Sequence, residues 1–311
     1  MSEFHPDDNF SLARKSQTLH TRAGLIQRIR LFFINHGFLE VETPLRIPSP
    51  APEEHIEALP SGNWFLQTSP ELCMKRLLAA DYSFIFQISK CFRADERGDK
   101  HLPEFTMLEW YCAGFDYHQL MDQCQDLVWA VAKDMGIPEI IRQNTKINLE
   151  PPWEKITVAN AFLKYAPVTP EEALAQNKFD EILVDYIEPQ LGMNRPTFLY
   201  DYPAKLASLA RLNQNNPDVS ERFELYIGGL ELANGFSELT DAHEQRRRFE
   251  EALQSRAVQS RAHYEMPEKF LHALENLPPC AGIALGIDRL LMVLTGQEKI
   301  DDVVAFTPEI L

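Results

Sequence analysis

The sequence predicts an α+β fold in which helices flank a central antiparallel β-sheet. Two segments, Tyr82–Arg93 and Glu104–Cys112, have strand composition and enclose a charged loop, which is typical of an antiparallel hairpin. Further segments with the composition of strands or the apolar spacing of helices lie on both sides of this hairpin. The strands are expected near 196–200, 222–228 and 230–239, and the helices near 22–36, 70–80, 117–136, 170–188 and 268–276.

The remaining elements follow from local signals. Gly37 ends the first helix, and Phe38–Glu42 then alternates apolar and acidic residues like a strand. Residues 45–64 are rich in proline and predict a loop. Near the C-terminus, Gly282–Arg289 is expected to open a final apolar helix. We therefore expect one domain, residues 21–311, after a polar N-terminal extension, residues 1–20.

Composition restricts the functional class. The 311 residues carry a formal net charge of −16, and such a surface repels nucleic acid unless a local basic patch offsets it. The one dense basic cluster, Arg246–Arg248, lies in a predicted helix, and we interpret it as a solvated helix face. The five cysteines form no CxxC pair, and neither a signal peptide nor a membrane-length apolar run is present. We expect a cytoplasmic protein that does not contact a membrane.

Side-chain alternation in the hairpin suggests a binding surface. Phe105, Glu109 and Tyr111 project from one face of the second strand, together with Met107. Arg93 ends the first strand, where its guanidinium could hold an anion beside a stacked ring. Taken singly, an exposed glutamate and a surface arginine are the commoner interpretations.

A second candidate surface is acidic. Glu224, Glu231 and Glu238 lie on one predicted strand pair, and either Gly235 or a bulge near Ala233 would bring all three to the same side. Carboxylates gathered in this way need Mg²⁺ or a cationic ligand, unless they belong to a solvent-facing hairpin. No P-loop or Rossmann fingerprint occurs. A nucleotide would instead use the close backbone approach that Gly282 and Gly286 permit before Arg289, although tight helix–sheet packing is an alternative explanation of these glycines.

Together, these segments resemble class II aminoacyl-tRNA synthetases from about residue 20 to the C-terminus. The helix and strand over residues 25–44, which end in Gly37–Pro44, resemble motif 1, while Phe92–Tyr111 resembles motif 2 and Gly286–Arg289 motif 3. The lysyl branch is indicated by segments that resemble its sequences almost letter for letter. These segments are Thr68–Glu71, Lys75–Leu78, Arg222–Glu224 and Asn234–Leu239. The resemblance implies a class II catalytic domain that uses ATP and Mg²⁺ to form an aminoacyl-adenylate.

The resemblance also implies roles for individual residues. Arg93 and Arg289 would be catalytic and bind ATP, with Arg93 also holding the substrate carboxylate, while Glu224 and Glu231 would hold Mg²⁺. Other residues implied to contact ATP are Asp95, His101, Leu102, Phe105, Glu231, Leu232 and Gly286. Those implied to contact the amino acid are Ser69, Pro70, Glu71, Glu109, Tyr111, Asn234, Phe236, Glu238 and Ala284. The acidic residues at this end favour an ammonium-bearing, lysine-like substrate.

The segment before motif 1 is too short for an anticodon-binding barrel, so we expect a catalytic domain alone. This arrangement resembles the free-standing lysyl-synthetase paralogues that join (R)-β-lysine to a lysine of elongation factor P. Ser69 and Ala284 replace the alanine and glycine usual in tRNA enzymes, and both would reshape the amino-acid pocket. Asp95 and Leu102 replace a usual glutamate and a common asparagine. We expect a homodimer that does not bind tRNA. A truncated lysyl-tRNA synthetase and a non-catalytic regulatory paralogue are the alternatives.

Overall fold

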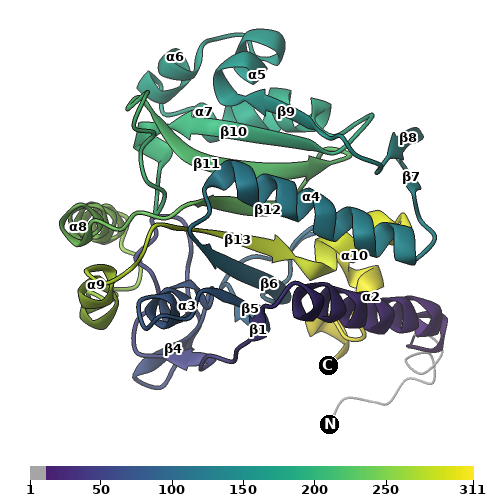
Figure 1. Ribbon diagram of the computed structural model, residues 1–311, viewed down its shortest axis with the longest axis horizontal. Coiled ribbons are helices and arrows are strands. Elements are labelled where there is room, and N and C mark those ends of the chain that lie inside the picture. The colour runs from purple at the N-terminus through teal and green to yellow at the C-terminus, as the bar shows by residue number, and fades with distance from the viewer. Residues whose placement is uncertain (1–11) are drawn as a thin grey trace.

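A computed structural model describes residues 12–311, within which eight strands form one sheet (Figure 1). In spatial order they are β1 (Leu39–Glu40), β5 (Phe84–Phe92), β6 (Glu104–Ala113), β13 (Cys280–Gly286), β12 (Leu230–Ser237), β11 (Val219–Ile227), β10 (Thr197–Pro203) and β9 (Glu154–Thr157). The six inner strands of this order pair antiparallel with one another, and the two edge strands, β1 and β9, pair parallel to their neighbours. The predicted α+β fold with an antiparallel centre is confirmed.

The other elements surround this sheet. Two small sheets consist of β2 (Arg46–Ile47), β4 (Trp64–Leu66) and β3 (Pro60–Ser61), and of β7 (Glu139–Arg142) and β8 (Thr145–Asn148). The α-helices are α2 (Ser16–Asn35), α3 (Glu71–Leu78), α4 (Tyr117–Asp134), α5 (Val158–Tyr165), α6 (Pro170–Ala175), α7 (Phe179–Ile182), α8 (Ala242–Val258), α9 (Glu268–Leu274) and α10 (Ile287–Thr295). Among residues 12–311, no helix combines the length and the apolar character needed to cross a membrane.

The two faces of the sheet have different partners. Helices α2, α4 and α10 cover one face and enclose the main core, where Trp110 of β6 packs beside Phe33 of α2 (Figure 1). The alternate residues of β6 point to the opposite face, and among them Tyr111 packs in a second apolar cluster with residues of α3, α8 and α9. Alternation along β6 therefore leaves Glu109 and Tyr111 on the face away from the main core, as the sequence predicts.

Three sequence expectations need correction. The first helix, expected near 22–36, begins at Ser16 as α2, and residues 1–11, part of the predicted extension, lie outside the described residues. The start of α2 is held by Lys15, which donates to main-chain carbonyls near residue 301, a contact invisible to local patterns. The helix expected over 170–188 divides into α6, α7 and a π-helical turn, because Asn177 adopts a left-handed conformation with φ of 53°. The proline-rich loop, residues 45–64, contains β2, β3 and the start of β4.

The strand β13 was also missed, because the whole segment Gly282–Arg289 was expected to open a helix. The part up to Gly286 belongs to β13, which lies in the middle of the sheet, and α10 begins at the next residue. A strand that is buried on both faces has no polar–apolar alternation in its sequence, and glycines such as those in β13 are usual signals of a turn. The side chain that comes close to Gly282 is that of Tyr111, because a Cβ at Gly282 would lie 2.2 Å from the Tyr111 ring. This agrees with the packing explanation of this glycine, and the nucleotide approach stays a prediction.

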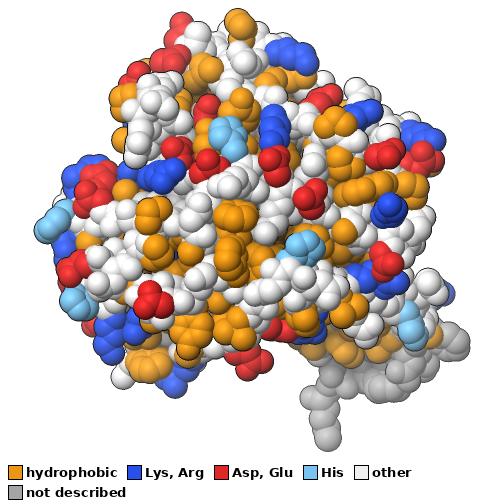
Figure 2. All heavy atoms as spheres, viewed as in Figure 1, with side chains coloured by type: hydrophobic (Ala, Val, Ile, Leu, Met, Phe, Trp, Pro, Cys, Tyr) orange, Lys and Arg blue, Asp and Glu red, His pale blue; other side chains and the backbone are white. Residues whose placement is uncertain are grey.

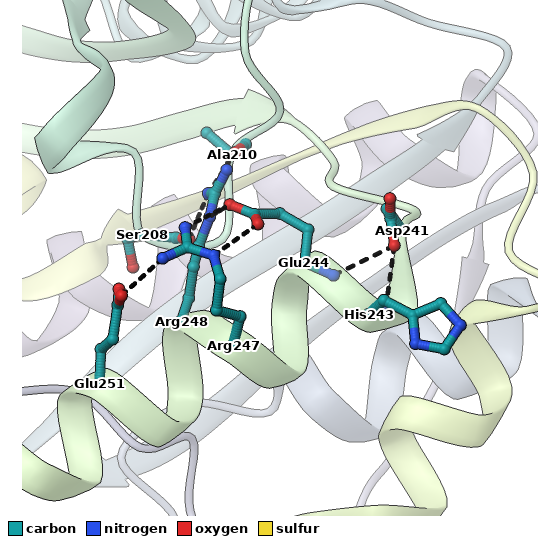
Figure 3. A network of polar contacts seen from close by, with 8 residues as sticks. All are labelled: Ser208, Ala210, Asp241, His243, Glu244, Arg247, Arg248 and Glu251. Atoms are coloured by element: carbon teal, nitrogen blue, oxygen red, sulfur yellow. Dashed lines mark hydrogen bonds and ion pairs between the residues drawn. The ribbon is translucent and has the colours of Figure 1, made fainter.

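The basic cluster on α8 is neutralised by neighbouring carboxylates (Figure 3). Arg247 pairs with Glu244 and Glu251, and Arg248 pairs with Glu244 and donates to main-chain carbonyls of residues 208 and 210. Arg246 pairs with Glu268 of α9. Basic and acidic side chains also interleave over the face of the molecule in Figure 2. The interpretation of this cluster as part of a helix surface, rather than as a basic patch, is confirmed.

Candidate active site

The end of the site that the sequence predicts to bind the nucleotide begins at the open end of the β5–β6 hairpin. Arg93 donates its main-chain N–H to the Pro103 carbonyl, and its guanidinium lies 5.1 Å from the centre of the Phe105 ring. Its Nε has no hydrogen-bond partner among the described residues, and its Nη1 is 3.7 Å from Glu96. Glu96, rather than Asp95, therefore approaches this arginine. The result is a loosely paired cation beside an aromatic ring, which is suited to an anion attached to a flat base.

Arg289, in the first turn of α10, links the nucleotide end to the acidic strand pair. Its Nη1 donates to the main-chain carbonyl of Glu231 at 2.9 Å and lies 3.2 Å from Oε2 of the same residue. Its Nη2 lies 2.7 Å from Nε2 of His101, which must accept because a guanidinium only donates. Burial, together with the charge of Arg289, lowers the pKa of His101. The three predicted residues thus meet in one place.

Helix α10 is oriented by an ion pair that the sequence reasoning missed. Asp288 is buried and pairs with Arg22 of α2 at 2.5 Å. Its second oxygen accepts the main-chain N–H of Thr106 at 2.7 Å. Asp288 therefore fixes the start of α10 against β6, and with it the direction of Arg289.

The other residues predicted to contact the nucleotide, Gly286, Leu102 and Leu232, differ in whether their main chain or their side chain is accessible to a ligand. Gly286 ends β13 opposite Met107, and a Cβ there would meet only the side chain of Arg289. The side chains of Leu102 and Leu232 are buried in the main core, so these two residues offer a nucleotide only their main chain.

The predicted bulge in β12 is confirmed and brings the acidic residues together. Leu225 pairs with Ala233, but the next residue, Tyr226, pairs with Glu231, which leaves Leu232 unpaired. The extra residue reverses the side-chain parity of β12. As a result Glu231 shares a side with Glu224 of β11, and the charge of Glu231 contributes to raising the pKa of Glu224.

Glu224 is held by three donors. It accepts hydrogen bonds from the hydroxyls of Tyr202 and Tyr226, both at 2.6 Å, and from Arg222 at 2.7 Å. Burial raises its pKa, while Arg222 acts in the opposite direction. In residues 12–311 no group of three metal-ligating side chains is found. The pair Glu224 and Glu231 nevertheless fits Mg²⁺, which is commonly bound by one or two carboxylates together with substrate phosphates.

The amino-acid end contains a buried network around Glu109. This carboxylate accepts hydrogen bonds from the hydroxyl of Ser69 at 2.6 Å and from that of Tyr111 at 2.8 Å. Burial and the neighbouring carboxylate of Glu71 raise the pKa of Glu109 to about 8. Register places Ala284 of β13 between Glu109 and Asn234, so the residue singled out for pocket shape lies beside this carboxylate.

Lys75 lies within the same network, although the sequence reasoning gave it no role. Its ammonium is fully buried, contacts Glu238 and lies 2.5 Å from Glu71. Burial alone would lower its pKa, but the two carboxylates raise it above its ordinary value. Phe236 flanks the ammonium, with its ring centre 5.1 Å away. Pro70 immediately precedes α3, from which both Glu71 and Lys75 project.

Comparison with known proteins agrees with this geometry. Residues 9–309 match the family described as tRNA synthetases class II (D, K and N). The chain belongs to this family. It is also 40% identical over 302 residues to an elongation factor P–(R)-β-lysine ligase of Proteus mirabilis, covering 92% of this chain and 93% of that protein. Proteins of the same name from Hamiltonella defensa and Klebsiella pneumoniae are 36% and 38% identical, and cover 97% and 92% of this chain and 98% and 93% of their own lengths.

The class II resemblance inferred from the motifs is therefore confirmed, together with its catalytic-domain fold. Within this class II domain, sequence reasoning missed Lys75, Arg22, Tyr202 and Tyr226. Lys75 and Tyr226 had local signals, since Lys75 follows Glu71 by four residues on one helix face and Tyr226 follows Glu224 by two residues on one strand face. Arg22 and Tyr202 reach the site from other elements.

Proposed function

We propose that this chain activates (R)-β-lysine, or lysine, with ATP as an aminoacyl-adenylate and transfers it to a lysine of elongation factor P. The observation that carries the proposal is the charge of the amino-acid end. Glu71, Glu109 and Glu238 contribute three negative charges when ionised, and Lys75 contributes one positive charge. The two negative charges that remain match a substrate with two ammonium groups, whereas an aspartate-like substrate would leave them unpaired.

The chemistry of activation follows from the opposite end of the site. Arg93 would bind the carboxylate of the amino acid and the α-phosphate of ATP, so that the carboxylate oxygen attacks phosphorus and pyrophosphate leaves. This carboxylate is ionised at pH 7, so no general base is needed. Phe105 would stack on adenine and Arg289 would cover its other face. Glu224 and Glu231 would hold Mg²⁺, which neutralises phosphate charge when bound.

In the second step, the neutral amine of the acceptor lysine attacks the carbonyl carbon of the adenylate. An amide bond forms, the bond to the phosphate breaks and AMP leaves. The names of the relatives support elongation factor P as the acceptor. The net charge of −16 and the interleaved charges in Figure 2 disfavour a polyanion such as tRNA. A cytoplasmic location agrees with an acceptor that acts in translation.

We also propose a homodimer formed through motif 1. Large apolar side chains are exposed on and around α2 and β1, where a partner subunit would cover them. They are Leu31, Ile34, Leu39, Leu45 and Phe84. Sedimentation at micromolar concentration tests this point, and a monomer at that concentration would contradict it.

The function is tested by ATP–pyrophosphate exchange with α-lysine and both enantiomers of β-lysine. We expect exchange that depends on a lysine-type amino acid, and no exchange with any of them would leave a non-catalytic regulatory protein as the better explanation. Purified elongation factor P and bulk tRNA are then offered as acceptors. A mass increase of the factor supports the ligase, whereas charged tRNA without that increase would favour a truncated tRNA synthetase.

A further inference from the structure

One arginine far from the site in sequence is fully engaged with a loop that reaches the site. Arg256, near the end of α8, is 1% exposed. It donates to the main-chain carbonyls of Glu53 at 2.9 Å and Ile56 at 2.8 Å, and to the carboxylate of Glu57 at 2.7 Å. Its other two bonds go to the Ala262 carbonyl. All five N–H groups of the guanidinium are therefore used, and three of them bind residues 53–57.

The same loop is held by a second residue beside Arg256. Tyr264 lies with its ring centre 3.9 Å from the guanidinium, and its hydroxyl accepts the main-chain N–H of Ala58 at 2.8 Å. Together, Arg256 and Tyr264 fix residues 53–58, which we call the anchored loop. This segment has no regular secondary structure, so these side chains replace the hydrogen bonds that a helix or strand would supply.

The opposite side of the anchored loop reaches the catalytic arginine. The carbonyl of Glu57 accepts the main-chain N–H of Ala94 at 2.8 Å, and Ala94 directly follows Arg93. The carboxylate of Glu53 lies within electrostatic range of Glu71 and Arg93. Arg93 itself is loosely held, because its Nε is unpaired among the described residues and its ion pair is long. The direction of its side chain therefore depends on how its backbone is fixed.

We propose that Arg256 is a positioning residue for adenylate formation, which acts by locking the anchored loop and thereby fixing the backbone that carries Arg93. The inference rests on the proposed function, since it assigns a role in the same reaction. A buried guanidinium is costly to desolvate, and an apolar side chain could fill the space. What Arg256 supplies, and an apolar side chain could not, is a set of directed hydrogen bonds that specify the conformation of the anchored loop.

Displacement of Arg93 would weaken a contact that strengthens in the transition state, so kcat should fall while KM for ATP changes little. A misplacement on the order of 1 Å at a reacting centre costs about 100-fold in rate. We therefore expect Arg256→Lys, which retains the charge but loses the fork of donors, to lower kcat about 10- to 100-fold.

The experiment measures kcat and KM for ATP and for the amino acid by pyrophosphate exchange in Arg256→Lys and Tyr264→Phe. Tyr264→Phe keeps the ring against Arg256 and removes only the hydroxyl that holds the anchored loop. This variant therefore still tests the proposal if Arg256→Lys does not fold. Arg247→Ala is the matched control, because Arg247 is exposed on the same helix and contacts only Glu244 and Glu251 (Figure 3). Thermal unfolding establishes that each variant is folded.

The expected result is a lower kcat with nearly unchanged KM for ATP in both variants, and an unchanged control. Unchanged kcat in folded variants, or a weaker KM for ATP without a fall in kcat, would overturn the role of Arg256. Absence of exchange in the wild-type protein would refute the proposed function itself. The two failures are thus distinguished by whether the unmodified protein reacts.

Discussion

Binding of a diamino acid should release protons from the enzyme, and Glu109 is one source, together with Glu238, whose pKa burial also raises to about 8. The Glu109 side chain is 1% exposed, its hydrogen-bond partners are the hydroxyls of Ser69 and Tyr111, and Glu71 is a like charge nearby. Burial first, and then Glu71, raise its pKa to about 8. At pH 7 roughly nine-tenths of the free enzyme would hold this carboxyl protonated. An ammonium ligand requires the carboxylate, so binding must expel that proton.

The magnitude follows from linkage. Glu109 should contribute about one released proton at pH 7, and its protonation should lower affinity for the diamino acid roughly tenfold for each pH unit below 8. Isothermal titration calorimetry in buffers of different ionisation enthalpy measures the release directly. Glu109→Gln removes this titrating group, so release should fall by about one proton and affinity should fall about tenfold or more at pH 9, from loss of a charged hydrogen bond. Wild-type binding without proton release and with pH-independent affinity would refute the reasoning.

The same group affects stability with a defined sign. The folded-state pKa of about 8 exceeds the ordinary value of 4.5, so the contribution of Glu109 is complete below pH 4.5 and is lost as pH rises through 8. A glutamine at this position does not titrate, so its contribution to the free energy of unfolding does not change with pH. Relative to wild type, Glu109→Gln should therefore gain up to about 5 kcal/mol between pH 4.5 and 9, at about 1.4 kcal/mol per pKa unit. Urea unfolding at both pH values measures this difference, and a constant difference would contradict the assignment.

Three further predictions concern single side chains. Arg93→Ala should abolish pyrophosphate exchange while the unfolding temperature stays near wild type, and near-normal exchange would refute its catalytic role. Lys75→Met leaves a buried carboxylate without its cation and should cost about 3–5 kcal/mol in urea unfolding, with part recovered by adding Glu238→Gln; additive losses would show that the pair is not linked. Gly282→Ala places a Cβ 2.2 Å from the Tyr111 ring, so calorimetry should show loss of amino-acid binding with ATP binding retained, and normal lysine affinity would count against this packing.

Much of the site could be predicted because its signals are local. Side-chain direction in a strand alternates whatever surrounds it, so Phe105, Glu109 and Tyr111 could be assigned to one face before any partner was known. The bulge near Ala233 was predictable for a similar reason, since only an irregularity could give Glu231 and Glu238 a common side. The order of these motifs then identified the class II family without any knowledge of distances.

Local patterns could not reveal which side chains meet across the fold. Ion pairing between Lys75 and Glu238, and between Arg22 and Asp288, joins residues that are far apart in the chain. The strand β13 was missed because a central buried strand lacks alternation.

The sequence by itself determined the family, the antiparallel centre of the sheet and the set of charged residues available for chemistry. Only the tertiary structure decided how those charges balance. Lys75 takes up one of the negative charges at the amino-acid end, and Glu109 is left with hydroxyl partners alone. The reason is physical: the charge of a site and the pKa values within it depend on burial and on neighbours at a few ångströms, and strand pairing and helix packing set both.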